Sequence, residues 1–387
     1  MPPVEPKALE PKHRLTVVQI LPALESGGVE RGTLEVGKYL VEQGHRSIVI
    51  SAGGRLVEQL QREGSEHIAW DVGRKSLMTL LRFVGRLRRF LRDEQVDILH
   101  IRSRMPGWVA YLAWKGMDPK HRPHLVSTVH GMYSVNAYSA VMTKGEVVIA
   151  VSETVRQYVL DRYPDATADR VKLIYRGVDR EQYAYGFKPS AEWLEAWRKQ
   201  YPELAGKQLL TLPGRITRLK GHEDFLGLIA DLKQTHPTIH GLIIGGAEAS
   251  KHAYLDELKS LTTRLGIDSN VTFTGQRSDL REIMAVSHLV LSLSTQAESF
   301  GRTVLEALSL GIPVCGYNHG GVGEQLHALM PVGMVPLGDK QALGKTVRDF
   351  LQAPPGVPRE HDFTLRNMLA ATLNVYLGLN KEPTLAT

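Results

Sequence analysis

Two basic residues stand where an apolar run gives way to a helical pattern. Arg215 and Lys220 lie in "TLPGRITRLKGHEDFL", residues 211–226, and are bracketed by Gly214 and Gly221. Arginine makes forked contacts with phosphate oxygens, and lysine adds a point charge. A helix N-terminus at Gly221 adds unpaired amides and a positive dipole end. The pattern predicts that a doubly negative ligand binds here, and the alternative is a solvated basic turn.

Two glutamates form a second candidate site in "AESFGRTVLEALSLGIPV", residues 297–314. Glu298 is expected in the loop after a strand, and Glu306 about a turn and a half into the helix that begins near Gly301. Carboxylates accept hydrogen bonds from adjacent sugar hydroxyls, and free amides at 299–302 bind oxygen atoms. The alternative is a helix with one outward-facing glutamate.

Two further motifs follow strands in the first half of the chain. Gly27 and Gly28 in "LESGGVERG" allow a ligand to approach the backbone, but the motif lacks the G-x-G-x-x-G spacing of nicotinamide and flavin sites. His130 ends an apolar strand in "STVHGMYS". A histidine at that position can serve chemistry or can be a satisfied structural residue.

Short apolar runs alternate with helical periodicity along the chain, which predicts doubly wound parallel sheets. The pattern restarts after residue 200, so we expect two Rossmann-like domains facing a cleft. Strands are expected at 15–21, 46–51, 96–101, 124–130, 147–152, 171–175, 208–214, 241–246, 271–275, 289–294 and 313–317, and helices at 28–43, 76–94, 221–235, 250–265 and 301–310. The expected parts are a disordered lead-in (1–13), an acceptor-side domain (14–185), a nucleotide-sugar domain (186–362), and a C-terminal helix packing back toward the first domain, with a tail (363–387).

The amino-acid composition narrows the class of protein to which the chain can belong. Among the 387 residues, 43% are hydrophobic and 23% charged, and Cys315 is the only cysteine, which excludes a disulfide framework and fits a reducing, cytoplasmic setting. The polar N-terminus and the lack of a long apolar stretch lead us to expect neither translocation nor a membrane span. The histidines show no ligand spacing, and no Walker A, H-E-x-x-H or G-x-S-x-G motif occurs. We predict no protein-held metal.

Taken together, the motifs resemble the retaining glycosyltransferases of family 4, which have the two-domain GT-B fold. The similarity lies in "GGVE" after the first strand, "HG" after an inner strand, "GRITRLKG" opening the second domain, and "ESFGRTVLEA" near its end. It extends from about residue 14 to 378 and includes "GIPV" (311–314) and "GGVGE" (320–324). The family contains many transferases of lipopolysaccharide core and other envelope glycans.

The resemblance implies a role for each motif. Arg215 and Lys220 would hold the diphosphate of a nucleotide-sugar, Glu306 the ribose hydroxyls and Glu298 the sugar hydroxyls. His130 would lie beside the reacting carbon. The expected catalytic residues are His130, Arg215, Lys220 and Glu298, and the expected donor-binding residues are Gly27, Gly28, Arg215, Lys220, Phe273, Gly275, Gln276, Glu298, Ser299, Phe300, Gly301 and Glu306. No tightly bound cofactor is expected, and UDP-sugars are favoured over GDP- and ADP-sugars.

The acceptor is expected to be a glycan or a lipid-linked molecule. Residues 76–92 form a basic amphipathic helix, with Leu77, Leu80, Leu81, Val84, Leu87 and Leu91 on one face and Arg82, Arg86 and Arg89 on another. Such a helix can rest on anionic lipid at the inner face of the membrane, or can be an ordinary surface helix. Arg176 stands where the family usually has asparagine, which favours an acidic acceptor if it faces the cleft.

Three other functions compete with sugar transfer. A non-hydrolysing 2-epimerase of similar architecture would bind the same donor but needs further acid and base residues. A non-catalytic basic binding protein would not need both the cation pair and the spaced glutamates. Nucleic-acid binding is disfavoured although the net charge is +6, because no RNA-reading or zinc-finger signature accompanies the basic segments.

Overall fold

The protein was analysed as a computed structural model that describes residues 14–25, 27–247 and 251–380. The expected lead-in and the last seven residues of the expected tail lie outside the described residues. The chain divides into two compact units. The first comprises the chain up to Val151, Arg156–Ile174 and the chain from Leu369 on, and the second comprises Ser152–Val155 and Tyr175–Met368. The sequence-based boundary was placed at 185/186.

The first unit is built on a parallel sheet. Its elements are β1 (Thr16–Ile20), α1 (Gly28–Glu42), β2 (Arg46–Ser51), α2 (Val57–Arg62), β3 (Glu66–Ala69), α3 (Leu77–Asp93), β4 (Ile98–Ile101), α4 (Arg104–Lys115), β5 (His124–Val129), β6 (Val147–Ala150), α5 (Glu153–Arg162, shared with the second unit) and β7 (Val171–Leu173). Among the described residues the strand order is β3-β2-β1-β4-β5-β6-β7. The chain order therefore reverses between β1 and β4.

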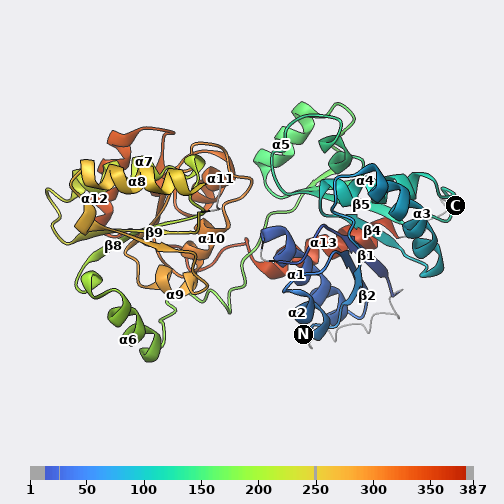
Figure 1. Ribbon diagram of the computed structural model, residues 1–387, viewed down its shortest axis with the longest axis horizontal. Coiled ribbons are helices and arrows are strands. Elements are labelled where there is room, and N and C mark those ends of the chain that lie inside the picture. The colour runs from blue at the N-terminus through green and yellow to red at the C-terminus, as the bar shows by residue number, and fades with distance from the viewer. Residues whose placement is uncertain (1–13, 26, 248–250, 381–387) are drawn as a thin grey trace, which may run out of the picture. The chain divides into compact units, whose positions relative to one another are not determined.

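The second unit repeats this plan. Its elements are α6 (Ala191–Gln200), β8 (Gln208–Pro213), α7 (His222–Leu232), β9 (Ile239–Ile244), α8 (His252–Arg264), β10 (Val271–Gly275), α9 (Leu280–Ala285), β11 (Leu289–Ser292), α10 (Arg302–Ser309), β12 (Val314–Tyr317), α11 (Gly320–Leu329), β13 (Met334–Val335), α12 (Lys340–Gln352) and α13 (Leu365–Leu379, which continues into the first unit). The described strands run in the order β10-β9-β8-β11-β12-β13. Figure 1 shows α7, α8 and α12 on one side of this sheet and α9 on the other.

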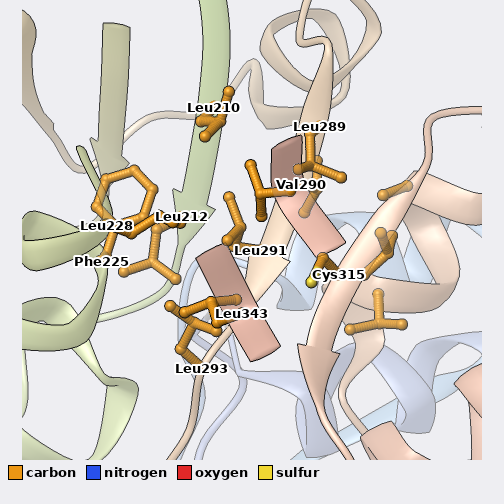
Figure 2. Packing of buried hydrophobic residues seen from close by; sticks show 14 of the residues in the cluster. Leu210, Leu212, Phe225, Leu228, Leu289, Val290, Leu291, Leu293, Cys315 and Leu343 are labelled. Carbon is orange, nitrogen blue, oxygen red and sulfur yellow. The ribbon is translucent and has the colours of Figure 1, made fainter. Parts of the chain in front are cut away.

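The central strands are buried on both faces, which explains their apolar sequences. All residues of β9 and β11 are buried, as expected for parallel strands covered by helices on each side. The core between the sheet and its helices includes Leu212, Phe225 and Leu291 (Figure 2). Cys315 lies in the same core, and burial raises the pKa of its thiol to about 12, so this cysteine is a packing residue.

Two described strands, β3 and β13, were missed in the sequence. Both are edge strands: β3 is half exposed, and β13 contains only two residues. Neither segment carries the continuous apolar run that marks a strand covered on both faces.

The prediction for the amphipathic helix was wrong in part. Thr79, Phe83, Leu87 and Leu91, spaced four apart, face inward in α3, and Phe83 stacks on Trp70 at 5.9 Å between ring centroids. Leu77, Met78 and Leu81 instead point outward and are 71%, 72% and 70% exposed. The expected apolar face is therefore divided into a buried part and an exposed part.

Neither unit contains a described helix that is long and apolar enough to cross a membrane.

Candidate functional site

The cation and glutamate motifs of the second unit lie at one edge of its sheet. The chain order reverses between β8 and β11, and ligands of open α/β sheets bind beyond the carboxyl ends of the strands at such a point. Arg215 and Lys220 follow β8, and Glu298 follows β11. Because β8 and β11 pair in parallel, both loops leave the same edge. The sequence-predicted residues are thus placed where a ligand is expected.

The loops at this edge are tied to one another through the backbone. The Gly214 amide donates to the Ile244 carbonyl at 2.8 Å, and the Thr295 amide donates to the Leu219 carbonyl at 2.9 Å. A β-carbon on Gly245 would lie 1.9 Å from the Gly214 carbonyl oxygen, so only glycine fits there. These contacts hold the loop that carries the cations against its neighbours on both sides.

Lys220 and Glu298 are joined directly. The Lys220 Nζ lies 2.7 Å from Glu298 Oε1, and both side chains are about three-quarters buried, at 28% and 23% exposure. The Ser294 hydroxyl donates to the same carboxylate oxygen. Arg215 is exposed on the loop between β8 and the short 3₁₀ turn Arg218–Lys220. The site therefore presents an ammonium group held by an ion pair beside an exposed guanidinium.

A glycine pair forms the floor under Glu298. The Gly321 amide donates to the Glu298 carbonyl at 2.8 Å. A β-carbon on Gly320, whose φ is +60°, would lie 2.7 Å from the same oxygen. Gln325 completes the support, because its side-chain amide donates to the Phe300 carbonyl and contacts the Gly321 carbonyl at 3.2 Å. The motif "GGVGE" thus fixes the loop that carries Glu298 and Ser299.

Helix α10 carries Glu306 one turn after its first residue, Arg302. Gly301 caps the helix with a φ of +85°, as its predicted place at a helix start requires. Glu306 is buried at 6% exposure, and its Oε1 lies 3.7 Å from Nε of Arg302. The Phe300 ring packs toward Tyr175 and Phe363, so the ring belongs to the hydrophobic core of the second unit.

Phe273, Gly275 and Gln276, which the sequence assigns to donor binding, lie in or directly after β10. Gly275 and Gln276 lie at the carboxyl end of β10, where the Gly275 carbonyl accepts from the Gly245 amide at 3.0 Å. Phe273 lies two residues earlier, and its side chain lines a shallow pocket with Lys259 and Thr262 of α8. The contacts of Phe273 therefore direct its ring to the helix layer.

Gly27, Gly28 and His130 lie in the first unit. Gly27 is the N-cap of α1, which begins at Gly28 directly beyond β1, and the Gly27 amide donates to the Glu30 carboxylate. His130 follows β5 at the same edge of that sheet. Arg176 belongs to the second unit, where its guanidinium contacts the Met368 sulfur at 3.9 Å.

His222 also supports the basic loop, although sequence analysis assigned it no role. Burial lowers its pKa to about 4, so the ring is neutral at pH 7, and its Nδ1 lies 3.2 Å from the Thr217 carbonyl. The neutral ring can donate this bond and hold the turn that carries Lys220. Ser294 and Gln325 were likewise missed, because their roles depend on contacts that no local motif encodes.

Comparisons with known proteins address the family. The model of Glycosyltransferase Family 4 matches residues 26–182, and that of Glycosyl transferases group 1 matches residues 195–365. The chain belongs to this family of glycosyltransferases. A glycosyltransferase structure from Rickettsia africae is similar, with 29% identity, a TM-score of 0.83, and coverage of 96% of this chain and 100% of the other. The expected family and transferase class are confirmed.

Two further comparisons concern the fold and the curated relatives. The Anabaena protein HepE, solved in complex with UDP, has a TM-score of 0.74 at 22% identity, with 95% of this chain and 97% of HepE covered. The expected GT-B fold of two parallel-sheet domains is therefore confirmed. A D-inositol 3-phosphate glycosyltransferase from Corynebacterium jeikeium is 26% identical over 294 residues, 70% of this chain and 69% of the relative. The chain spans about three fifths of the length of the curated relatives it matches first.

In the part of the chain that the structure describes, no three His, Cys, Asp or Glu side chains gather in a way that could hold a metal ion.

Proposed function

We propose that this chain transfers a sugar from a nucleoside-diphosphate sugar to a glycan or lipid-linked acceptor, with retention of the anomeric configuration. The observation that carries the proposal is the ion pair between Lys220 and Glu298 at the point where the strand order reverses. An ammonium group there suits a leaving diphosphate, and the carboxylate beside it suits sugar hydroxyls. Membership in the glycosyltransferase family supports the same assignment.

The charges fit the demands of the reaction. As the bond from sugar to phosphate breaks, negative charge grows on the diphosphate and positive charge grows on the sugar ring. Lys220 and Arg215 would stabilise the first, and Glu298 would lie near the second. Groups fixed in advance, as Lys220 and Glu298 are by their mutual contact, lower such a barrier without having to reorganise.

Retention requires that the acceptor attack from the face that the diphosphate leaves. We propose that the departing phosphate accepts the proton of the acceptor hydroxyl, so that the protein need not supply a separate base. His130 would border the reacting carbon, and the backbone from Ser299 to Gly301 would hold the sugar and phosphate.

The proposed activity is tested by mixing the purified protein with UDP-, GDP- and ADP-glucose and with simple sugar acceptors, then following nucleotide release and the anomeric proton signals by NMR. UDP-glucose is the first donor to test, because HepE, which shares the fold, was solved with UDP. A product with the donor's anomeric configuration supports the proposal. An inverted product contradicts the retaining mechanism, and epimerised nucleotide-sugar without transfer favours the 2-epimerase instead.

The acceptor and its location are also proposals. We propose that the start of α3 docks on an anionic membrane, which suits a transferase of lipid-linked envelope glycans, including lipopolysaccharide. Leu77, Met78 and Leu81 form an exposed apolar cluster, and the exposed Lys75 and Arg82 flank it. Apolar side chains can enter the headgroup region while the cations meet lipid phosphates.

Vesicle sedimentation tests this docking. Wild-type protein should sediment with vesicles of phosphatidylcholine and phosphatidylglycerol but not with pure phosphatidylcholine, and the triple variant L77S/M78S/L81S should stay in the supernatant. Val332→Ser removes an equally exposed apolar residue of the second unit, at 62% exposure, and should bind as wild type does. Equal sedimentation of the triple variant and wild type would exclude this surface.

A further inference from the structure

The first unit contains a buried arginine that the described residues hydrogen-bond only in part. Arg102 follows β4 immediately and is 2% exposed. Among the described residues, its Nε and Nη2 have no hydrogen-bond partner. A guanidinium stays protonated in proteins, and a buried charge without hydrogen bonds is costly. Such a side chain is expected to bind an acceptor group that the chain does not supply.

The position of Arg102 is that of a ligand site. The strand order of the first unit reverses between β1 and β4, and Arg102 lies at the carboxyl end of β4, where its amide donates to the Ile20 carbonyl at 3.1 Å. Helix α4 begins directly after it at Arg104, and the Ser103 hydroxyl does not cap that helix. Helix α1 begins beyond β1 at the same edge. Both helix N-termini favour negative charge.

A polar stripe leads to Arg102 along one face of the sheet. Gln19 and His100 are register partners on β1 and β4, and strand alternation puts Arg102 on the same face as His100. The Gln19 Oε1 is buried and also has no hydrogen-bond partner within the described residues. The face therefore presents guanidinium donors and an amide acceptor without partners, a combination suited to an anion that carries hydroxyl groups.

Cations and aromatic rings surround this edge. The Arg104 guanidinium lies 4.8 Å from the centroid of the Tyr133 ring and 5.3 Å from that of Tyr138, and the Lys75 ammonium lies 5.6 Å from the Tyr138 centroid. Negative charge is also close, because Glu35 acts electrostatically on Arg102. Entry of a ligand requires the side chains over Arg102 to move, because Arg102 is 2% exposed.

We propose that Arg102 binds an anionic group, a phosphate monoester or a carboxylate, on the acceptor sugar. The inference rests on the proposed function and deepens it, because it assigns an acidic acceptor to the transferase. A D-inositol 3-phosphate glycosyltransferase among the relatives acts, by its name, on an acceptor that carries such a group. The proposal itself stands on the Nε and Nη2 of Arg102, which have no hydrogen-bond partner among the described residues and lie at the reversal point of the first sheet.

Calorimetry on protein saturated with UDP tests the assignment, because UDP occupies the donor phosphate site and leaves the acceptor side to the probe. The probes are glucose 6-phosphate, glucuronate and glucose. One of the two anionic sugars should bind, and glucose should bind at least tenfold more weakly. Arg102→Met should weaken the anionic probe by at least ~30-fold, as loss of a buried charged hydrogen bond does, and should leave UDP affinity unchanged.

Matched variants separate this role from a structural one. Arg62→Met removes an exposed arginine of the same unit and should bind the probes as wild type does. Arg102→Met should keep or raise the melting temperature of the unliganded protein, because no hydrogen bond of Nε or Nη2 is lost and a costly buried charge is removed. Arg102→Gln serves as a second uncharged variant.

Three outcomes overturn the proposal. The first is equal affinity of wild type and Arg102→Met for the anionic probes, and the second is no binding of either probe to the UDP-loaded protein. The third is failure of both Arg102 variants to fold, which would show that the side chain stabilises the unit directly. Failure of UDP itself to bind would instead refute the proposed function.

Discussion

Gly320→Ala tests whether the glycine floor under Glu298 fixes the donor site. The new methyl group would lie 2.7 Å from the Glu298 carbonyl oxygen and 2.9 Å from both the Glu298 amide nitrogen and the Ala297 β-carbon. Residue 320 also has a φ of +60°. The left-handed backbone costs alanine about 1–2 kcal/mol, and overpacking against backbone adds about 1–3 kcal/mol. We expect a total of roughly 2–5 kcal/mol from these two terms.

The protein can relieve this strain in two ways. If the Glu298 loop moves, UDP affinity should fall about tenfold or more, since 1.4 kcal/mol corresponds to a factor of ten. If the loop stays in place, the second unit should melt roughly 4–20 °C earlier, since 1 kcal/mol shifts the melting temperature of a unit of this size by about 2–4 °C. Thermal unfolding and UDP calorimetry on the same preparations measure both outcomes.

Gly227→Ala provides the matched control. It adds the same methyl group in the middle of α7, where no heavy atom lies within 4 Å of the new β-carbon. Alanine is favoured over glycine in a helix interior by about 0.5–1 kcal/mol, so this variant should be slightly more stable and should bind UDP normally. If Gly320→Ala behaved like Gly227→Ala in both assays, the floor would have no role in positioning Glu298.

Three further predictions concern single side chains. Tyr376→Phe should destabilise the first unit by about 1–3 kcal/mol, because it removes the buried hydroxyl that lies 2.6 Å from His100 Nδ1. As a control, Tyr185→Phe changes a half-exposed tyrosine and should alter stability little. Urea unfolding measures the free energy of unfolding of both variants. Burial lowers the pKa of His240 in the folded protein to about 4. As the pH falls below 6.5, this histidine therefore binds a proton in the unfolded chain before it does so in the folded protein. The stability present above pH 6.5 should be lost as the pH falls toward 4. His240→Gln should reduce that loss between urea midpoints at pH 7 and pH 5, and an unchanged loss would exclude His240 as its source. Glu306→Gln should lower UDP affinity at least tenfold at unchanged melting temperature, while the exposed Glu257→Gln should not; equal affinities would remove Glu306 from the ribose site.

The sequence was sufficient for the features that local pattern encodes. Buried parallel strands such as β9 read as continuous apolar runs, and Gly301 marked the start of α10. The carboxyl-end rule then placed Lys220 and Glu298 on one edge before any contact was known. The structure adds that these two side chains meet, at 2.7 Å.

The sequence was insufficient where a role depends on contacts between distant segments. Gln325 supports the loop at Phe300 from another helix, and no spacing in the sequence indicates that bond. The inward face of α3 was misassigned because periodicity does not show which turn the neighbouring layer covers, and Leu77 and Leu81 were grouped with buried residues. Arg102 went unnoticed because its lack of partners is visible only in the folded unit.

The central claim is that the loops after β8 and β11 bind a nucleoside diphosphate, and calorimetric titration with UDP, GDP and ADP tests it most directly. The wild-type protein should be compared with an Arg215→Ala/Lys220→Ala double variant, after a melting experiment has shown that the two proteins are equally stable. The account predicts that one nucleotide binds the wild type and that the double variant loses most of that affinity. Binding of no nucleotide, or equal binding by the double variant, would contradict it.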